Sequence, residues 1–213
     1  MLEQNKKSQI LKLSFISLAI AALGLLVWRF DADILIFIQN YIRNDFLDAV
    51  FPFYTTLGED GIIWIVIGLI LLIPKKTRKC GIMVLAALLV MLVVNNLTLK
   101  KLFARTRPCY TEGIMHLFPG LVEIPKVTSF SFPSGHTTSA FSVAFTIYKQ
   151  HKKLGIVAIV MAAIMAFTRL YVFVHFPTDI YGGIIVAAGI AYFVYRMEKI
   201  ITPKIQKLIK KKS

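Results

Sequence analysis

A series of long apolar runs constrains this chain more than any other feature of its sequence. The clearest run extends from Cys80 to Leu99 and has the length of roughly 20 residues that a helix needs to cross a bilayer. Backbone N–H and C=O groups find no water inside a bilayer, so such a run is expected to satisfy them within one helix. The composition agrees, because 57% hydrophobic and only 17% charged residues indicate a membrane protein rather than a soluble domain.

Six runs can be placed along the sequence, at 13–28, 61–73, 80–99, 134–148, 154–168 and 180–195. The first could instead be a secretory signal peptide, but it ends in Trp28 and Arg29 without a small-residue cleavage pattern. The second is too short to span a bilayer, so it is expected to recruit residues between Tyr54 and Asp60. Apolar residues at roughly helical spacing in 33–57 indicate an interfacial amphipathic helix. The sequence therefore predicts one all-α domain over 1–213, a polytopic bundle of six transmembrane helices.

The net charge of +14 is compatible in principle with nucleic-acid binding, but the distribution of the charge rejects that function. With six spans, most Lys and Arg fall on the face that holds both termini, in the loop 74–79, in 149–153 and in a basic tail over 196–213. The positive-inside rule then places both termini and this tail in the cytoplasm, in a protein of the cell membrane. Cys80 and Cys109 fall on opposite faces, so no intrachain disulfide is expected.

Polar motifs stand at the ends of the apolar runs on the other, extracytoplasmic face. In Pro133-Ser134-Gly135-His136 a turn leads directly into an apolar run. Ser134 suits the N-cap of a helix, and Gly135 lets backbone N–H groups approach an anion closely. Taken alone, this motif is as compatible with a capped helix start as with a phosphate site.

Two further motifs flank that turn in the sequence. Upstream, Lys100 is followed after six residues by Arg107 and Pro108, and downstream, Arg169 is followed by His175 and Asp179. A membrane protein holds such charges only where they face water or a partner. The topology brings the three motifs to one membrane face, so we expect their side chains to converge.

The three motifs resemble those of the integral-membrane branch of the type 2 phosphatidic acid phosphatase superfamily, which shares its phosphate site with vanadium haloperoxidases. The motifs of that family are Lys-x6-Arg-Pro, Pro-Ser-Gly-His and Ser-Arg-x5-His-x3-Asp. Thr168 stands where the third motif usually has Ser, and it keeps the hydroxyl. The resemblance covers about the C-terminal half of the chain and implies a lipid phosphatase that needs no metal and no cofactor.

The resemblance also implies a role for each motif residue. His175 would attack phosphorus and form a phosphohistidine, and His136 would protonate the leaving group and then activate water. We expect a helix to begin at Pro177, which leaves Asp179 in its first turn, where the carboxylate can fix the histidine tautomer. Cationic side chains, a hydroxyl and backbone N–H groups would hold the phosphate oxygens, and they belong to Lys100, Arg107, Ser134, Gly135 and Arg169.

Other interpretations remain open at this point. Lys100 and Arg107 could merely flank a span, and Arg169 and Asp179 could form a structural ion pair between two helices. Charged residues in membranes also mark ion paths, so an ion or lipid transporter is the alternative to an enzyme, although clustering at one end opposes it. A lipid-binding protein without activity would be expected to lack a motif histidine or the aspartate, and none is lacking.

The substrate expected for such a site is a membrane lipid with a phosphate or diphosphate head. Undecaprenyl diphosphate is the preferred candidate, with phosphatidylglycerophosphate and phosphatidate as alternatives, and the sequence indicates no obligate protein partner. Lys101, Arg105 and Lys126 lie on the same face outside the motifs and could bind a second phosphate as an outer subsite. The loop 102–132 is expected to border the mouth of the site, with Tyr110 and His116 near it.

Overall fold

Every regular element in the part of the chain that the structure describes is helical. The computed structural model describes residues 2–111 and 127–212. The α-helices are α1 (Leu2–Arg29), α2 (Asp31–Phe37), α3 (Asp45–Thr56), α4 (Ile62–Leu72), α5 (Arg78–Met91), α6 (Lys100–Phe103), α8 (Gly135–Gln150), α9 (Lys152–Tyr171) and α10 (Pro177–Lys212). Short 3-10 or π-helical segments occupy Ile38–Ile42, Glu59–Gly61, Leu92–Leu99 and Pro108–Tyr110. The prediction of an all-α fold is confirmed for these residues.

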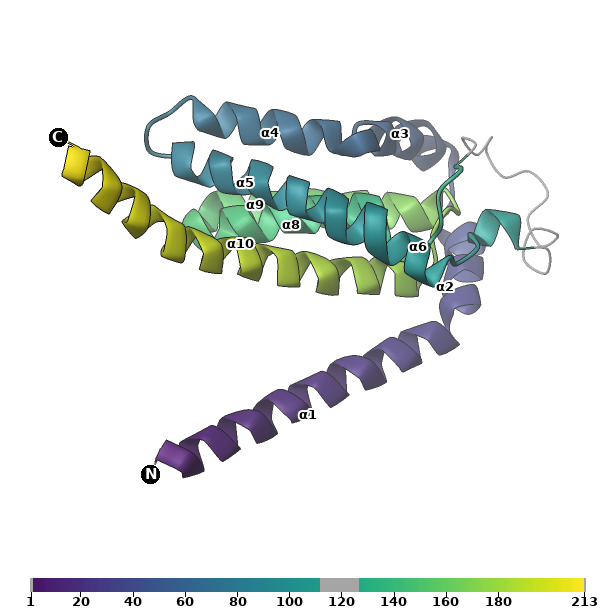
Figure 1. Ribbon diagram of the computed structural model, residues 1–213. Helices are drawn as coiled ribbons and strands as arrows, with labels where there is room; N and C mark the ends of the chain where they lie inside the picture. Colours follow the sequence, from purple (N-terminus) through teal and green to yellow (C-terminus); the bar gives the residue numbers. More distant parts are fainter. Residues whose placement is uncertain (1, 112–126, 213) are drawn as a thin grey trace.

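The helix α8 lies at the centre of the bundle, where it packs against α5, α9 and α10 (Figure 1). Its residues from Thr137 to Ala144 are all buried, which is the pattern of a helix surrounded by neighbours. The many Ser, Thr and Ala side chains of α8 let adjacent backbones approach it closely. The largest apolar cluster, which includes Trp64, Val143 and Met165, joins α4, α8 and α9.

Three helical stretches are long and apolar enough to cross a membrane, namely Arg78–Tyr110, Lys152–Tyr171 and Pro177–Pro203. Two bent pairs raise the number of candidate spans to five; they join Ser14–Arg29 to Asp31–Ile42 at 55° and Asp45–Thr56 to Glu59–Leu72 at 51°. The expected fourth span corresponds to α8, whose 16 residues rise about 24 Å, short of a hydrocarbon core of about 30 Å. The described residues form a membrane protein with three to five candidate spans, and the number six stays a prediction.

The interfacial helix expected over 33–57 is not a single element. Asn44 divides it and caps α3, since its Oδ1 accepts a hydrogen bond of 3.0 Å from the backbone N–H of Leu47. The helix α3 then leads into α4, and the two are separated by a turn in which Asp60 and Gly61 have φ angles of 50° and 74°. A left-handed backbone interrupts a helix. The candidate second span joins Asp45–Thr56 to Glu59–Leu72, so it would include the whole of α3, more than the few residues that the sequence indicated.

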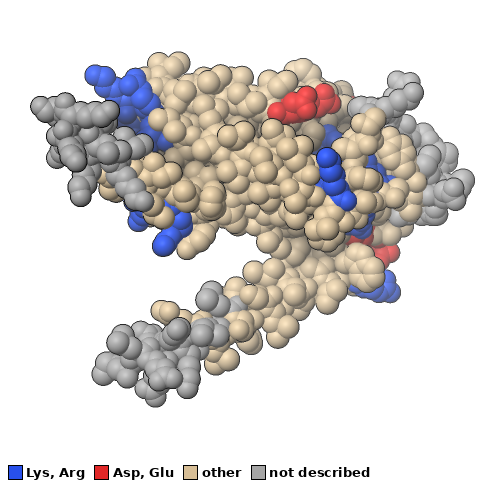
Figure 2. Space-filling view, viewed as in Figure 1, with Lys and Arg blue, Asp and Glu red and all other residues tan. Residues whose placement is uncertain are grey.

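Both ends of the chain lie toward one end of the bundle, and α2 and α6 lie at the opposite end (Figure 1). The helix α1 diverges from the bundle and meets α10 near its own C-terminal half, where the Tyr181 hydroxyl donates a hydrogen bond of 2.6 Å to Ile20 O. On the visible face, charged side chains gather toward the two ends with an uncharged area between them (Figure 2). Cys80 and Cys109 are both free, as expected.

Candidate active site

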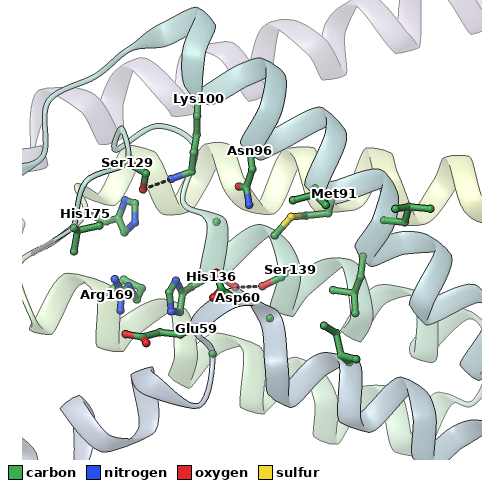
Figure 3. A pocket seen from close by; sticks show the side chains of 18 of the residues that line it. Glu59, Asp60, Met91, Asn96, Lys100, Ser129, His136, Ser139, Arg169 and His175 are labelled. Atoms are coloured by element: carbon green, nitrogen blue, oxygen red, sulfur yellow. Dashed lines mark hydrogen bonds between the residues drawn. The ribbon is translucent and has the colours of Figure 1, made fainter. Parts of the chain in front are cut away.

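The residues of all three motifs meet at the end of the bundle opposite the chain termini. A cavity of about 870 Å³ lies there, and most motif side chains face it (Figure 3). The motif residues that border it are Lys100, Arg107, Gly135, His136, Arg169 and His175. Ser134 and Asp179 lie behind this wall. The structure thus brings together groups that the sequence places at the ends of separate helices.

His175 and Asp179 form a buried pair at the start of α10. The helix begins at Pro177 as predicted, and His175 Nδ1 lies 3.3 Å from Asp179 Oδ2. The same oxygen accepts hydrogen bonds from the Ser131 hydroxyl and from the backbone N–H of Phe176. Both members of the pair are at most 1% exposed. Several donors therefore fix the carboxylate, and the carboxylate orients the imidazole.

Arg107 contacts the other ring nitrogen of His175. Its Nη1 lies 3.0 Å from His175 Nε2, while its Nε donates to Ser129 O at 2.7 Å and its Nη2 to Ser129 Oγ at 3.0 Å. A guanidinium can only donate hydrogen bonds, so Nε2 acts as the acceptor and the proton of a neutral ring lies on Nδ1, toward Asp179. The lone pair of Nε2 therefore points toward the cation, where a phosphate would be held.

The imidazole of His175 is neutral at ordinary pH. Burial is the main cause, and the cations Arg107, Arg169 and Lys100 reinforce it in that order. Together they hold the pKa of His175 well below its ordinary value of about 6.5. A neutral imidazole keeps Nε2 unprotonated and can act as a nucleophile.

Lys100 is also buried, with 7% of its surface exposed. Its Nζ donates to Phe130 O at 2.8 Å and approaches Ser129 Oγ at 3.5 Å, next to the cavity. Arg107 is only 3% exposed. Neither side chain reaches out to water as a residue that merely flanks a span would, so that alternative is wrong.

The end of α3 supports Arg169 and His136 in a way that no motif predicts. Arg169 Nη1 donates to Thr55 Oγ1 at 2.6 Å, and a Cβ placed on Gly58 would lie 2.8 Å from His136 Cδ2. Arg169 Nε and His136 Nε2 are buried without a hydrogen-bond partner among the described residues. An anion in the cavity would satisfy both atoms. The one sequence signal for this support is the polar interruption between 54 and 61, ahead of an apolar run too short to span.

Ser134 serves the helix rather than the cavity. Its Oγ accepts hydrogen bonds from the backbone N–H and the hydroxyl of Thr137, which confirms the predicted N-cap of α8. Its own backbone N–H donates to Asp179 O at 3.1 Å. The backbone N–H groups of Ser134 and Gly135 were both expected to face a phosphate. That of Ser134 is instead hydrogen-bonded to Asp179 O, whereas Gly135 borders the cavity.

Arg105 is not the spare cation that the sequence indicated. Its Nη1 donates to Asp179 Oδ1 at 2.8 Å and its Nη2 to Asp31 Oδ2 at 2.7 Å. The alternative ion pair between Arg169 and Asp179 is also wrong. Asp179 pairs with Arg105 and His175, while Arg169 donates to Thr55.

The wall of the cavity is partly acidic in the region that the structure describes. Glu59 and Asp60 border it, whereas Tyr110 does not. His116 and Lys126 lie outside the described residues. Arg105 pairs with Asp31 and Asp179, so it is not available for the outer phosphate subsite that the sequence predicted. That subsite therefore gives no support for a preference for a diphosphate substrate.

The cavity has an apolar side as well as a cationic one. Ile65 of α4 and Leu85 and Leu89 of α5 border it, along with Leu92 just beyond α5. One continuous space can therefore receive an anionic head and an apolar tail at the same time. This combination suits an amphiphilic substrate such as a phosphorylated lipid.

Comparisons with known proteins agree with this chemistry. The chain is 29% identical over 160 residues to an undecaprenyl-diphosphatase of Sulfolobus acidocaldarius, covering 75% of this chain and 74% of that protein. It is 24% identical over 172 residues to an undecaprenyl-diphosphatase of Bacillus subtilis, covering 79% and 83%. Among solved structures it is similar to a transmembrane PAP2 type phosphatidylglycerolphosphate phosphatase of Bacillus subtilis, with a TM-score of 0.63, 26% identity and coverage of 86% and 96%.

A family model decides the assignment. The model of the PAP2 superfamily matches residues 80–202, a segment that contains every motif residue named above and more than half of the chain. The helical membrane fold and the cavity described here fit the membrane lipid phosphatases of that family. The chain belongs to the PAP2 superfamily.

Proposed function

We propose that the protein hydrolyses the terminal phosphate of a lipid diphosphate through a phosphohistidine on His175. The observation that carries this proposal is the geometry of His175, whose Nδ1 is held by Asp179 and whose Nε2 lies 3.0 Å from Arg107 Nη1 beside the cavity. A nucleophile thus lies next to a cation that can bind the nonbridging oxygens of a phosphate. Lys100 and Arg169 border the same cavity and can share that charge.

The reaction balances in two steps. His175 Nε2 attacks phosphorus, the bond between phosphorus and the lipid-side oxygen breaks, and protonated His136 gives its proton to that oxygen. His136 then takes a proton from water, the hydroxide attacks phosphorus, and the bond to His175 breaks to release phosphate. Nε2 of His136 has no partner among the described residues, so it is available to the leaving group. A bound phosphate anion nearby would favour the protonated ring of His136.

Undecaprenyl diphosphate is the substrate we favour, because two similar proteins are undecaprenyl-diphosphatases. Phosphatidylglycerophosphate is the alternative, since the similar solved structure is a phosphatidylglycerolphosphate phosphatase. Either lipid would place its head among Lys100, Arg107 and Arg169 and its tail along the apolar wall from α4 and α5. The chemistry at His175 is the same for both.

We further propose six membrane passes in one domain over 1–213, with both termini and the basic tail at 196–213 in the cytoplasm. The excess of Lys and Arg on the side of the termini supports this orientation. The active site would then face the extracytoplasmic side of the cell membrane. Labelling of single cysteines placed at Lys76 and Lys101 with a membrane-impermeant reagent tests it, because only the second should react in intact cells.

The test of the function is phosphate release from purified enzyme in matched detergent micelles. We expect a higher kcat/KM for undecaprenyl diphosphate than for phosphatidylglycerophosphate or phosphatidate, and no release by His175→Ala. With p-nitrophenyl phosphate, whose leaving group needs no proton, His136→Ala should accumulate an acid-labile phosphoenzyme, because water is no longer activated. A fully active His175→Ala would rule out the covalent route, whereas a preference for glycerophospholipids would change only the substrate.

A further inference from the structure

The carboxylate of Asp179 is held on both oxygens, and Arg105 holds the oxygen that His175 does not use. Oδ2 faces His175 Nδ1, whereas Oδ1 accepts from Arg105 Nη1 at 2.8 Å. The same Nη1 donates to Thr178 Oγ1 at 2.7 Å, and the guanidinium lies 4.1 Å from the ring centre of Phe176. Arg105 therefore contacts three residues in and just before the first turn of α10.

Asp31 of α2, far from Arg105 and Thr178 in the sequence, contacts both of them. Its Oδ2 accepts from Arg105 Nη2 at 2.7 Å and from the Thr178 hydroxyl, and its Oδ1 accepts from the backbone N–H of Thr178 at 2.9 Å. Asp31 is 6% exposed, so its carboxylate lies out of bulk water, whereas 25% of the Arg105 side chain is exposed. Asp31 both caps the first turn of α10 and fixes the guanidinium that holds Asp179.

The charges around Asp179 show why its contact with Arg105 matters. The cation in direct contact with the carboxylate is Arg105; Lys100 and Arg107 act on it from farther away, and His175 is neutral. A buried carboxylate without a contacting cation favours its protonated form. A protonated Asp179 would be a poor acceptor for His175 Nδ1–H, and the tautomer that presents Nε2 to the substrate would lose its support.

We propose that Arg105 and Asp31 are positioning residues of the active site, which keep Asp179 charged and oriented so that His175 presents Nε2 to phosphorus. This inference rests on the proposed function, since it assigns His175 as the nucleophile. Asp31 lies outside residues 80–202 that the family model matches, so part of the catalytic support comes from the helix α2. Neither residue touches the cavity.

The test compares Arg105→Gln with Lys75→Gln, which removes one positive charge from an exposed residue between α4 and α5 that does not border the cavity. We expect Arg105→Gln to lower kcat on the order of 10²-fold, as misplaced catalytic groups do, with little change in KM. The acid limb of the kcat/KM profile should move to higher pH, because the carboxylate then binds a proton more readily. Lys75→Gln should match the wild type in both readouts.

Two more variants separate charge from geometry. Arg105→Lys restores the charge but cannot reach Asp31, Thr178 and Asp179 together, so its acid limb should return toward that of the wild type while kcat recovers only in part. Asp31→Asn removes the anion that fixes the guanidinium, and its effect on the acid limb should largely disappear in the Arg105→Gln background, because that effect reaches Asp179 through Arg105.

The outcomes distinguish this inference from the proposed function. If the wild type releases phosphate and Arg105→Gln matches Lys75→Gln, the positioning role is wrong and the phosphatase assignment stands. If Arg105→Gln loses thermal stability and activity together but keeps the wild-type pH profile, its role is structural and the proposal is again overturned. If His175→Ala remains active, the proposed mechanism fails whatever Arg105 does.

Discussion

In the proposed mechanism, Asp179 and Arg107 select Nε2 of His175 as the nucleophile, and this selection has a measurable pH signature. Burial and then Arg107 and Arg169 hold the pKa of His175 well below its ordinary value, so the ring stays neutral as the pH falls through about 6.5. With p-nitrophenyl phosphate, whose leaving group needs no proton, the burst rate of phosphoenzyme formation should stay level from pH 7.5 to about 5.5. A burst that drops tenfold for each unit below 6.5 would mean that His175 has an ordinary pKa.

Thr55 supports Arg169 from the end of α3, so its substitution should lower activity. Its Oγ1 accepts the 2.6 Å hydrogen bond from Arg169 Nη1, and a hydrogen bond to a charged group contributes about 1.5–3 kcal/mol. Thr55→Val keeps the shape of the side chain but removes the acceptor, so kcat/KM should fall by about tenfold or more. Thr55→Ser keeps the hydroxyl and is the matched control. Equal activities of the two variants in a phosphate-release assay would show that Arg169 does not depend on this contact.

At the scale of elements, the turn between α3 and α4 sets the position of Thr55 and Gly58 against the site. Gly61 in this turn has a φ of 74°, and a Cβ there would meet no atom within 4 Å. Gly61→Ala should therefore destabilise the protein through backbone strain alone, by about 1–2 kcal/mol. Gly189 in α10 is equally open but helical, so Gly189→Ala should be neutral or stabilising by up to about 1 kcal/mol. Thermal unfolding in detergent measures both, and equal shifts would exclude strain at Gly61.

The helix boundaries also show which features of the structure can be predicted from the sequence alone. Local signals predicted the N-cap at Ser134 and the helix start at Pro177, because capping and the fixed φ of proline act within a few residues. Motif spacing identified the side chains that border the cavity. Thr55 and Asp31 left no such signal, since each acts through a contact with a residue more than 70 positions away. The sequence therefore predicted the motif residues but not the residues that support them.

The break in the second span could not be placed from the sequence for a related reason. Hydropathy showed only that 61–73 was too short. The left-handed residues Asp60 and Gly61 lie in a turn that contacts α8, and the separate helix α3 packs against α9. Such contacts between distant segments leave no local signal in the sequence. The apolar residues of 33–57 do recur at helical spacing, but they are divided between α2 with the π-helical segment that follows it and the separate helix α3.

For the molecule as a whole, the chemistry of the cavity predicts its response to ions. No group of three or more His, Cys, Asp or Glu residues that could hold a metal ion occurs within 2–111 and 127–212, while three cationic side chains border the cavity. We expect chelators to leave phosphate release unchanged and orthovanadate to inhibit it in competition with substrate, as a phosphate analogue in an anion site should. A strict requirement for magnesium, restored after chelation, would contradict the metal-independent route.

The central position of α8 has a consequence for how the protein enters the membrane. Five of its buried side chains carry hydroxyls, namely Thr137, Thr138, Ser139, Ser142 and Thr146, and the helix is shorter than a bilayer is thick. Such a segment gains little from lipid by itself and is stabilised by the helices around it. During synthesis α8 should therefore stay at the translocon until α9 and α10 have emerged, so the helix that starts at Gly135 is among the last to insert stably into the bilayer.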